Sequence, residues 1–242
     1  MNLKYLKPLA TATNVMVVIP AFNEEGSLPG VIARLHEVGL DRIRVLDNGS
    51  SDRTAEVANQ CAAEVMTEPR RGYGQACWTG CQNLPPDVEW ILFCNADGSE
   101  DIERAPAMME LTGENAELVL GVRTVDASGH DHLTPSQRFG NKLATALIRR
   151  LWGAHYADLG PLRLISRRAF ERLNMQDRGF GWTVEMQVRA AEEGLNVREL
   201  LVRNFPRNTG VSKISGTVKG SIQAAAVILS TIAGLWLKRR LV

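Results

Sequence analysis

The chain has 242 residues, of which 45% are hydrophobic, so it can bury a substantial core as one large α/β domain or as a domain with an appendage. Lysine and arginine total 28 against 27 aspartate and glutamate residues, a balance that gives no indication of a nucleic-acid-binding protein. Cys61, Cys77, Cys81 and Cys94 include no CxxC pair, which favours buried thiols in a reducing compartment. No signal peptide is visible and no stretch reaches the roughly 18 to 20 apolar residues of a membrane span, so we expect a cytoplasmic protein.

Strand and helix signals alternate four times between residues 15 and 100. In chain order we predict a strand at 15–19 that Pro20 ends, a helix at 28–38, a strand at 43–46, a helix at 53–61, a short strand at 65–66, a helix at 72–81 and a strand at 88–94. This alternation is the signature of a mostly parallel, doubly wound α/β sheet with helices on both faces.

Three of these predicted strands end in polar residues. Asn23 and Glu24 follow the first, Asp47 ends the second, and Asn95 and Asp97 follow the fourth. Neighbouring parallel strands bring their carboxyl ends to one edge of the sheet, where open α/β sheets bind their ligands. An aspartate there can hold a divalent cation through oxygen, and the cation can hold a diphosphate. The alternative for Asp97 alone is an Asx-turn that leaves a strand, but the convergence of three strand ends favours a site.

The second half of the chain continues the α/β pattern. We predict a helix near 103–111, a strand at 117–122 followed by Arg123, a polar loop at 124–136, a basic amphipathic helix at 137–152, a strand at 162–165, a helix from Arg167, a helix at 182–193 that carries Glu185, and a strand at 197–202. The last strand leads to Arg207 and Lys213 in a loop that contains glycine and serine. His130 and His132 flank Asp131 in the polar loop, but without a third ligand in sequence we favour a mobile lid over a metal site.

The C-terminal segment differs from the rest of the chain. Between Ala224 and Leu237 its polar residues are Ser230 and Thr231, and the basic residues 238–240 follow. A helix that is apolar on nearly every side is not an ordinary surface helix. We expect it to lie at a membrane interface with its cations near anionic headgroups, and the alternative is burial against a partner subunit.

Taken in order, the motifs resemble those of the family 2 glycosyltransferases. The resemblance rests on the segments 17–25, 45–54, 70–74 and 95–99, which read VVIPAFNEE, VLDNGSSDRT, RRGYG and NADGS. Residues 158–163, the helix with Glu185 and residues 207–213 resemble the branch that contains the dolichyl-phosphate mannosyltransferases and polyprenyl-phosphate glucosyltransferases. The resemblance implies a GT-A-type, Rossmann-like domain over residues 1–216, with a nucleotide-sugar half at 15–100, an acceptor half at 101–216 and a separate C-terminal apolar helix at 217–242.

The resemblance also implies roles for individual residues. Those expected to bind the nucleotide sugar are Pro20, Ala21, Phe22, Asn23, Glu24, Asp47, Arg71, Gly72, Asn95, Ala96, Arg207 and Lys213. Asp47 is expected to contact the base or ribose. Asp97, with Asn95, is expected to hold Mg²⁺ or Mn²⁺ against the diphosphate of a UDP- or GDP-sugar. Arg123, Arg138 and the 207–213 loop are expected to face an acceptor phosphate.

The chain departs from the family pattern at two positions. Phe22 stands where the family often has tyrosine, so one hydroxyl contact is lost. Asn95 stands where the metal motif usually begins with aspartate. An amide oxygen can ligate a hard cation but brings no negative charge, so we expect weaker metal binding than in members with two acids.

These features predict an inverting transfer of a hexose from a nucleotide sugar to a polyprenyl or dolichyl phosphate. A cation on Asp97 would stabilise the leaving diphosphate. A phosphate acceptor is already ionised near neutral pH and needs positioning by cations more than a strong base. A hydroxyl acceptor would instead need a carboxylate base, for which Asp158 and Glu185 are the candidates, unless both serve as helix caps or ion-pair partners.

Two other readings of the function stay open at this point. A glycosyltransferase with a hydroxyl acceptor would use the same donor residues. A catalytically weak nucleotide-sugar-binding protein would account for Asn95. For the transferase we expect a peripheral position on the cytoplasmic membrane face through residues 218–240, with a homo-oligomer as a further expectation.

Overall fold

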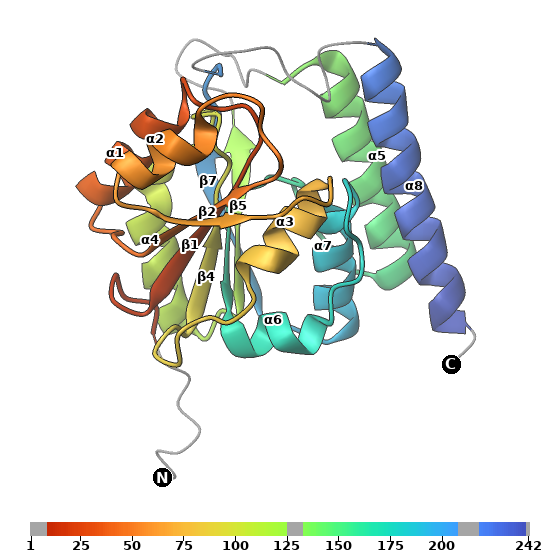
Figure 1. Cartoon of the computed structure of the whole chain (residues 1–242). Coiled ribbons are helices and arrows are strands. Elements are labelled where there is room, and N and C mark those ends of the chain that lie inside the picture. Colours follow the sequence, from red (N-terminus) through yellow and green to blue (C-terminus); the bar gives the residue numbers. More distant parts are fainter. Residues whose placement is uncertain (1–8, 125–132, 208–217, 241–242) are drawn as a thin grey trace, which may run out of the picture.

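A computed structural model describes residues 9–124, 133–207 and 218–240. Its centre is a seven-stranded sheet in the order β3-β2-β1-β4-β6-β5-β7 (Figure 1). The strands are β1 (Val15–Ala21), β2 (Ile43–Asp47), β3 (Glu64–Thr67), β4 (Trp90–Phe93), β5 (Leu118–Thr124), β6 (Arg163–Ser166) and β7 (Val197–Arg203). The pairs are parallel except where β6 runs antiparallel between β4 and β5. The predicted mostly parallel α/β sheet is confirmed.

Helices cover both faces of the sheet, as predicted (Figure 1). They are α1 (Leu28–Glu37), α2 (Thr54–Gln60), α3 (Tyr73–Gly80), α4 (Ala105–Glu110), α5 (Pro135–Trp152), α6 (Arg167–Leu173), α7 (Trp182–Glu192) and α8 (Val218–Arg240), with short 3-10 turns at Ile102–Arg104 and Leu111–Glu114. Side chains alternate along β1: Val17 packs with α1, α2 and α4 on one face, and Val18 packs with α3, α6 and α7 on the other. Both faces of the central strands are therefore buried, which explains their nearly continuous apolar sequence.

Pro20 does not end the first strand, which is a correction to the sequence prediction. β1 continues through Pro20 to Ala21, and Pro20 lies opposite Leu46 of β2. Val17 and Ala21 hydrogen-bond toward β2 and Val18 bonds toward β4, so Pro20 faces the β4 side. The β4 pairing has already ended at Val18. A proline without an N–H group costs no ladder hydrogen bond at this position.

The C-terminal helix α8 lies beside α5 on the outer side of α7 (Figure 1). Ile232 and Leu235 are buried in a separate apolar cluster that α5 and α7 complete with Ile148, Val184 and Val188. Part of the apolar surface of α8 is thus covered by the chain itself, a neighbour that neither sequence interpretation included. Among the helices described, none combines the length and the hydropathy that a membrane span requires.

Candidate active site

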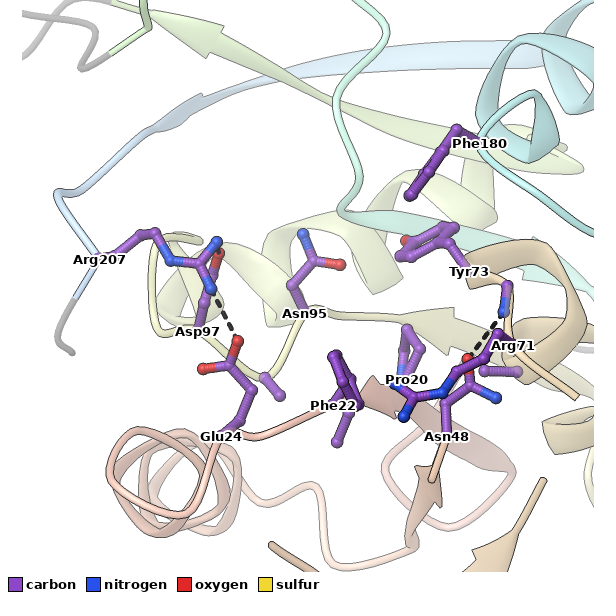
Figure 2. A pocket seen from close by; sticks show the side chains of 14 residues that line it. Pro20, Phe22, Glu24, Asn48, Arg71, Tyr73, Asn95, Asp97, Phe180 and Arg207 are labelled. Carbon is purple, nitrogen blue, oxygen red and sulfur yellow. Dashed lines mark hydrogen bonds and ion pairs between the residues drawn. The ribbon is translucent and has the colours of Figure 1, made fainter. Parts of the chain in front are cut away.

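A cavity of about 340 Å³ opens at the carboxyl ends of β1 and β4 (Figure 2). Its lining consists of Pro20, Ala21, Phe22, Glu24, Asn48, Arg71, Gly72, Tyr73, Ala76, Asn95, Ala96, Asp97, Phe180 and Arg207. β1, β2 and β4 are parallel neighbours, so the segments that follow them meet at one edge of the sheet, as the sequence predicted. The pocket therefore has the position at which open α/β sheets bind ligands.

One end of the pocket is acidic and is closed by an arginine. The guanidinium of Arg207 lies between Glu24 and Asp97 (Figure 2), with Nη2 2.7 Å from Glu24 Oε1 and Nη1 3.1 Å from Asp97 Oδ2. The other oxygen of Asp97, Oδ1, accepts hydrogen bonds from the backbone and hydroxyl of Ser99 at 2.9 and 2.7 Å. This turn orients the carboxylate so that Oδ2 faces the cavity end, where a positive charge already pairs with it.

The other end of the pocket combines aromatic rings with a second arginine. The guanidinium carbon of Arg71 lies 3.9 Å from the ring centroid of Phe22 (Figure 2), which is a close cation–π contact. Tyr73 and Phe180 lie across the cavity from them, and Phe180 is 41% exposed. A flat apolar wall beside a fixed cation suits a planar base or a sugar face near a phosphate.

The segment that carries Arg71 is held by Asn48 and Glu68. The Asn48 amide donates to the carbonyls of Glu68 and Arg70 at 2.8 Å each and accepts from the Gly72 N–H at 2.9 Å (Figure 2). Hydrogen bonds from Arg70, Thr79 and Gln75 converge on the buried carboxylate of Glu68 and hold its pKa well below the ordinary range, although burial alone would raise it. Arg71 therefore projects from a rigid loop.

Gly72 allows this loop to pass close to the segment before α7. Its φ is +148°, and a Cβ atom there would lie 2.2 Å from the carbonyl oxygen of Arg178. The backbone N–H groups of Gly74 and Gln75 donate to the carbonyls of Gly179 and Arg178 at 3.0 and 2.8 Å. These contacts bring Phe180 to the cavity.

Ten of the residues expected to bind donor or metal line this cavity: Pro20, Ala21, Phe22, Glu24, Arg71, Gly72, Asn95, Ala96, Asp97 and Arg207. Asn23 and Asp47 instead hold the loops after β1 and β2. Asn23 has φ +53° and accepts from the Ser51 N–H at 2.8 Å, and Asp47 accepts from the Ser50 N–H at 3.0 Å. Successive residues point to opposite sides, so the next side chain, that of Asn48, lines the cavity where Asp47 was expected.

Of the candidate acceptor-side residues in the described part of the chain, Arg207 lines the cavity, and Arg123, Arg138, Asp158 and Glu185 lie outside its lining. Asp158 is 3% exposed and bonds the Arg123 guanidinium at 2.8 Å through both oxygens, and it also accepts from the Arg123 N–H at 3.0 Å. Burial alone would raise the pKa of Asp158, but its hydrogen bonds and charge pairing with Arg123 outweigh this and lower it. Arg138 is exposed on α5. Lys213 and residues His130 to His132 fall outside the described residues.

Glu185 supports the segment before α7. Its carboxylate is 2% exposed and accepts from the backbone N–H groups of Gln176 and Asp177 at 3.0 and 2.6 Å, with Arg189 at 3.0 Å. Glu185 therefore has the geometry of a backbone cap and ion-pair partner, and Asp158 has that of an ion-pair partner. This is the alternative to a general base that the sequence left open. A carboxylate saturated in this way has little capacity left to accept a proton from a substrate.

Glu100 is a buried acid that the sequence interpretation did not include. It is 4% exposed, and its Oε2 accepts from the Asn95 N–H at 2.6 Å. Burial raises its pKa to about 7, with a further contribution from the charge of Asp97. The sequence offers one signal, because Glu100 is a second acid, after Asp97, within the short polar segment that follows β4.

The donor atoms fit a divalent cation held jointly with a ligand. No group of three or more His, Cys, Asp or Glu side chains in the described ranges could hold a metal alone. Mg²⁺ commonly takes one or two carboxylates from the protein and completes its shell with phosphate oxygens and water. Asp97 fits this pattern, since its carboxylate faces the cavity and already pairs with the positive charge of Arg207.

Comparison with known proteins gives a family and close relatives. The model of Glycosyl transferase family 2 matches residues 16–173. An uncharacterized glycosyltransferase of Mycobacterium bovis is 38% identical over 210 residues, which cover 87% of this chain and 94% of that protein. An undecaprenyl-phosphate mannosyltransferase of Micrococcus luteus is 28% identical over 218 residues, which cover 85% of this chain and 89% of that protein.

Solved structures give the same answer for the fold. The chain is similar to glucosyl-3-phosphoglycerate synthase from Mycobacterium tuberculosis in complex with Mn²⁺, UDP-glucose and phosphoglyceric acid. The TM-score is 0.71 with 20% sequence identity, and the match covers 95% of this chain and 86% of that one. This likeness confirms the predicted GT-A-type fold.

Proposed function

Because the chain belongs to glycosyl transferase family 2 and is a glycosyltransferase, we propose that it transfers a hexose, with inversion, from a nucleoside diphosphate sugar to a polyprenyl phosphate. The choice of a phosphate acceptor rests on the bonding partners of the carboxylates in and near the cavity. Glu24 and Asp97 are the acids in the described lining of the cavity, and both pair with Arg207. Asp158 and Glu185 are saturated by fixed partners. These acids are poorly suited to act as the general base that a hydroxyl acceptor requires.

The donor would lie along the cavity from its aromatic end to its acidic end. Phe22 and Arg71 offer a ring face and a cation for the nucleoside and its phosphates. Pro20 and Ala21 form the floor at the end of β1. Asn48 acts indirectly, because its amide holds the loop that presents Arg71.

The acidic end would hold the leaving group. Asp97, with the amide oxygen of Asn95, would hold Mg²⁺ or Mn²⁺, which when bound supplies a Lewis acid for the diphosphate. Arg207 pairs with Glu24 and Asp97 at this end of the cavity, so its guanidinium is positioned to pair with phosphate oxygens that enter there. Arginine suits this task because its planar fork matches phosphate oxygens two at a time.

A phosphate acceptor removes the need for a strong base. The second pKa of a phosphate monoester is about 6, so it is mostly ionised at neutral pH and can attack the sugar carbon directly. The protein then has to orient the acceptor and exclude water, and a bulky apolar residue at the rim assists both. Phe180, 41% exposed at the cavity, is placed for contact with an apolar acceptor tail.

The lipid acceptor places the protein at a membrane surface. Arg149 and Arg150 near the end of α5 and Lys238 and Arg239 near the end of α8 are exposed cations on two neighbouring helices, with Leu237 55% exposed beside them. Basic residues next to apolar side chains favour a surface of anionic lipid. We propose that this end of the α5–α8 pair contacts the membrane.

The test is a transfer assay with matched acceptors. The protein is incubated with UDP-glucose or GDP-mannose, Mn²⁺ and either undecaprenyl phosphate, undecaprenol or phosphoglyceric acid, and the glycosylated product is separated and its anomeric configuration determined. We expect product of inverted configuration from undecaprenyl phosphate with at least one donor, and none from undecaprenol. Product from undecaprenol or from phosphoglyceric acid alone would refute the polyprenyl phosphate assignment. UDP binding that is indifferent to Mn²⁺, with no turnover, would favour a nucleotide-sugar-binding protein.

A further inference from the structure

We propose that Glu100 supplies the negative charge that Asn95 does not bring to the cation site, and that it acts there as a positioning residue behind the turn from Asn95 to Asp97. This inference rests on the proposed function, in which Asp97 holds a divalent cation against the diphosphate. It concerns a residue outside the cavity lining, and it addresses Asn95, one of the two positions at which this chain departs from the family pattern.

The contacts of Glu100 place its charge at this turn. Oε2 accepts from the Asn95 N–H at 2.6 Å, so the carboxylate lies directly behind the residue that replaces the usual acid. The backbone of Glu100 is fixed on both sides, by a bridge to Asn204 and by the Arg34 guanidinium, which donates to its carbonyl oxygen at 2.8 Å. A carboxylate held this way cannot swing out to solvent without breaking the turn.

The second oxygen of Glu100 has no ion-pair partner of its own in the part of the chain that the structure describes: the charge of Arg123 acts on the carboxylate, but that guanidinium is already bonded by both oxygens of Asp158. Oε1 is buried and has no hydrogen-bond partner among the described residues, although the Cys94 thiol, a weak donor, lies beside the carboxylate. By contrast, Asp101 pairs with Arg203 at 3.2 Å. Burying an unsatisfied carboxylate oxygen is costly, so its retention calls for a functional explanation, of which a nearby ion is one.

The charge of the cavity shows what Glu100 adds. The charged side chains of its described lining are Glu24, Asp97, Arg71 and Arg207, two acids against two arginines. This set is neutral overall and by itself offers a divalent cation little net attraction. A bound cation favours the ionised form of Glu100, which makes the total negative by one charge, and charges interact more strongly in a protein interior than in water. Since Glu100 lies outside the described lining of the cavity, it contributes its field and the position of the turn, not a coordination bond.

The experiment is a double-mutant cycle on Mn²⁺ affinity. Mn²⁺ is titrated into full-length protein saturated with UDP, unbound Mn²⁺ is followed by electron paramagnetic resonance, and the titration of UDP alone is subtracted. E100Q keeps the shape and an acceptor for the Asn95 N–H but removes the charge. We expect about tenfold weaker Mn²⁺ binding, which is the usual cost of losing a group that supports a metal ligand. E110Q, an exposed acid on α4, is the matched control and should leave the affinity unchanged.

Asn95→Asp decides between a charge effect and a structural one. In the N95D background the aspartate carries the charge, so adding E100Q should cost less than about threefold, a non-additivity that loss of packing does not produce. An equal tenfold cost in both backgrounds, or no cost in either, would overturn the inference while leaving the proposed transfer intact. If E100Q does not fold, N95D alone still tests it, because a tenfold gain in affinity would show that the missing charge is not compensated. Failure of the wild type to bind Mn²⁺ with UDP would remove the cation and this inference together.

Discussion

Two groups of buried carboxylates in this molecule have the same chemistry and different tasks. At the edge formed by β1 and β4, Glu24 and Asp97 face a cavity and share the single guanidinium of Arg207. Behind β5 and β6, Asp158 and Glu185 meet fixed arginines and backbone N–H groups. The first group can exchange Arg207 for a ligand. The partners of the second group are fixed by the fold, so its carboxylates are not available to a ligand.

A buried arginine shows that the region around Asp158 and Glu185 has a structural role. Arg163 is 1% exposed and donates to the carbonyls of Gly160 and Thr183 and to the side-chain oxygen of Gln187, at 2.7 to 2.9 Å. Burial lowers its pKa to about 10. Each of these bonds ends on a neutral oxygen, so the guanidinium ties the loop before β6 to α7 and is not exposed to a substrate phosphate.

Asp97→Asn gives the largest expected effect and tests the first region. The amide keeps the turn with Ser99 but removes the charge that would hold the cation, so we expect kcat to fall about 10³-fold, at the upper end for loss of one electrostatic contribution in a preorganised site. The transfer assay measures the rate, and circular dichroism checks the fold. The exposed ion-pair variant D41N is the control. Near wild-type activity in D97N would place the chemistry elsewhere.

Asp158→Asn tests the second region through stability. The change leaves Arg123 facing a neutral group at a buried position, and we expect the free energy of unfolding to fall by about 3 kcal/mol, as for other broken buried pairs. Urea denaturation measures the loss, and calorimetry should find UDP affinity unchanged. An unaltered stability with a large loss of kcat and a shifted pH profile would instead support Asp158 as a general base.

The same residue predicts how stability depends on pH. Its pKa is lowered in the folded chain, so its contribution to stability is complete above the ordinary value near 4 and is lost as pH falls through the folded value. The wild type should therefore lose stability on acidification below about pH 4 more steeply than D158N. Equal slopes for the two proteins in that range would contradict the pairing with Arg123.

These two regions also show what the sequence can predict. The strand ends converge as expected because parallel pairing is encoded in the apolar runs of β1, β2 and β4. The sequence does not predict which of two adjacent polar residues lines the cavity. Asn48 does so in place of Asp47, because the direction of a side chain at a strand end depends on the turn that follows. The pairing of Arg207 with Glu24 joins residues 183 positions apart, and no local pattern reveals it.

The roles of single acids were harder to predict than the fold. Asp158 and Glu185 stand in motifs shared with a family, but their partners, Arg123 and the backbone before α7, are set by tertiary packing. Glu100 was missed for the same reason, since it is buried where an isolated bridge pairs its backbone with that of Asn204, more than 100 residues later in the chain. A residue type identifies what a side chain can do, and its neighbours decide whether it remains available.

Gly72→Ala tests the loop that presents Arg71. A Cβ atom would lie 2.2 Å from the Arg178 carbonyl oxygen at a φ of +148°, so we expect a loss of about 2 kcal/mol in stability from overpacking and strain. UDP affinity should fall as well, because Arg71, which directly precedes Gly72, is proposed to contact the donor phosphates. Thermal melting and calorimetry measure the two effects. G30A is the control, since a Cβ there meets nothing within 4 Å in helix α1.

The smallest expected effect concerns the membrane contact of the α5–α8 pair. Lys238 and Arg239 lie at the exposed end of α8, and each cation near an anionic surface contributes about 1 kcal/mol, so K238Q/R239Q should weaken binding to vesicles containing one-third anionic lipid about tenfold or more. The control R104Q/R168Q removes two exposed cations elsewhere, on Arg104 before α4 and Arg168 of α6. Sedimentation with vesicles measures the binding of both double variants, at low and at physiological salt, because a charge-driven contact weakens as salt is added.

Equal losses in the two double variants would mean that net charge, not this end of the helix pair, drives the association. K238Q/R239Q should transfer sugar to a short-chain, water-soluble polyprenyl phosphate at the wild-type rate. The cavity and its carboxylates lie at the sheet edge and not on α8.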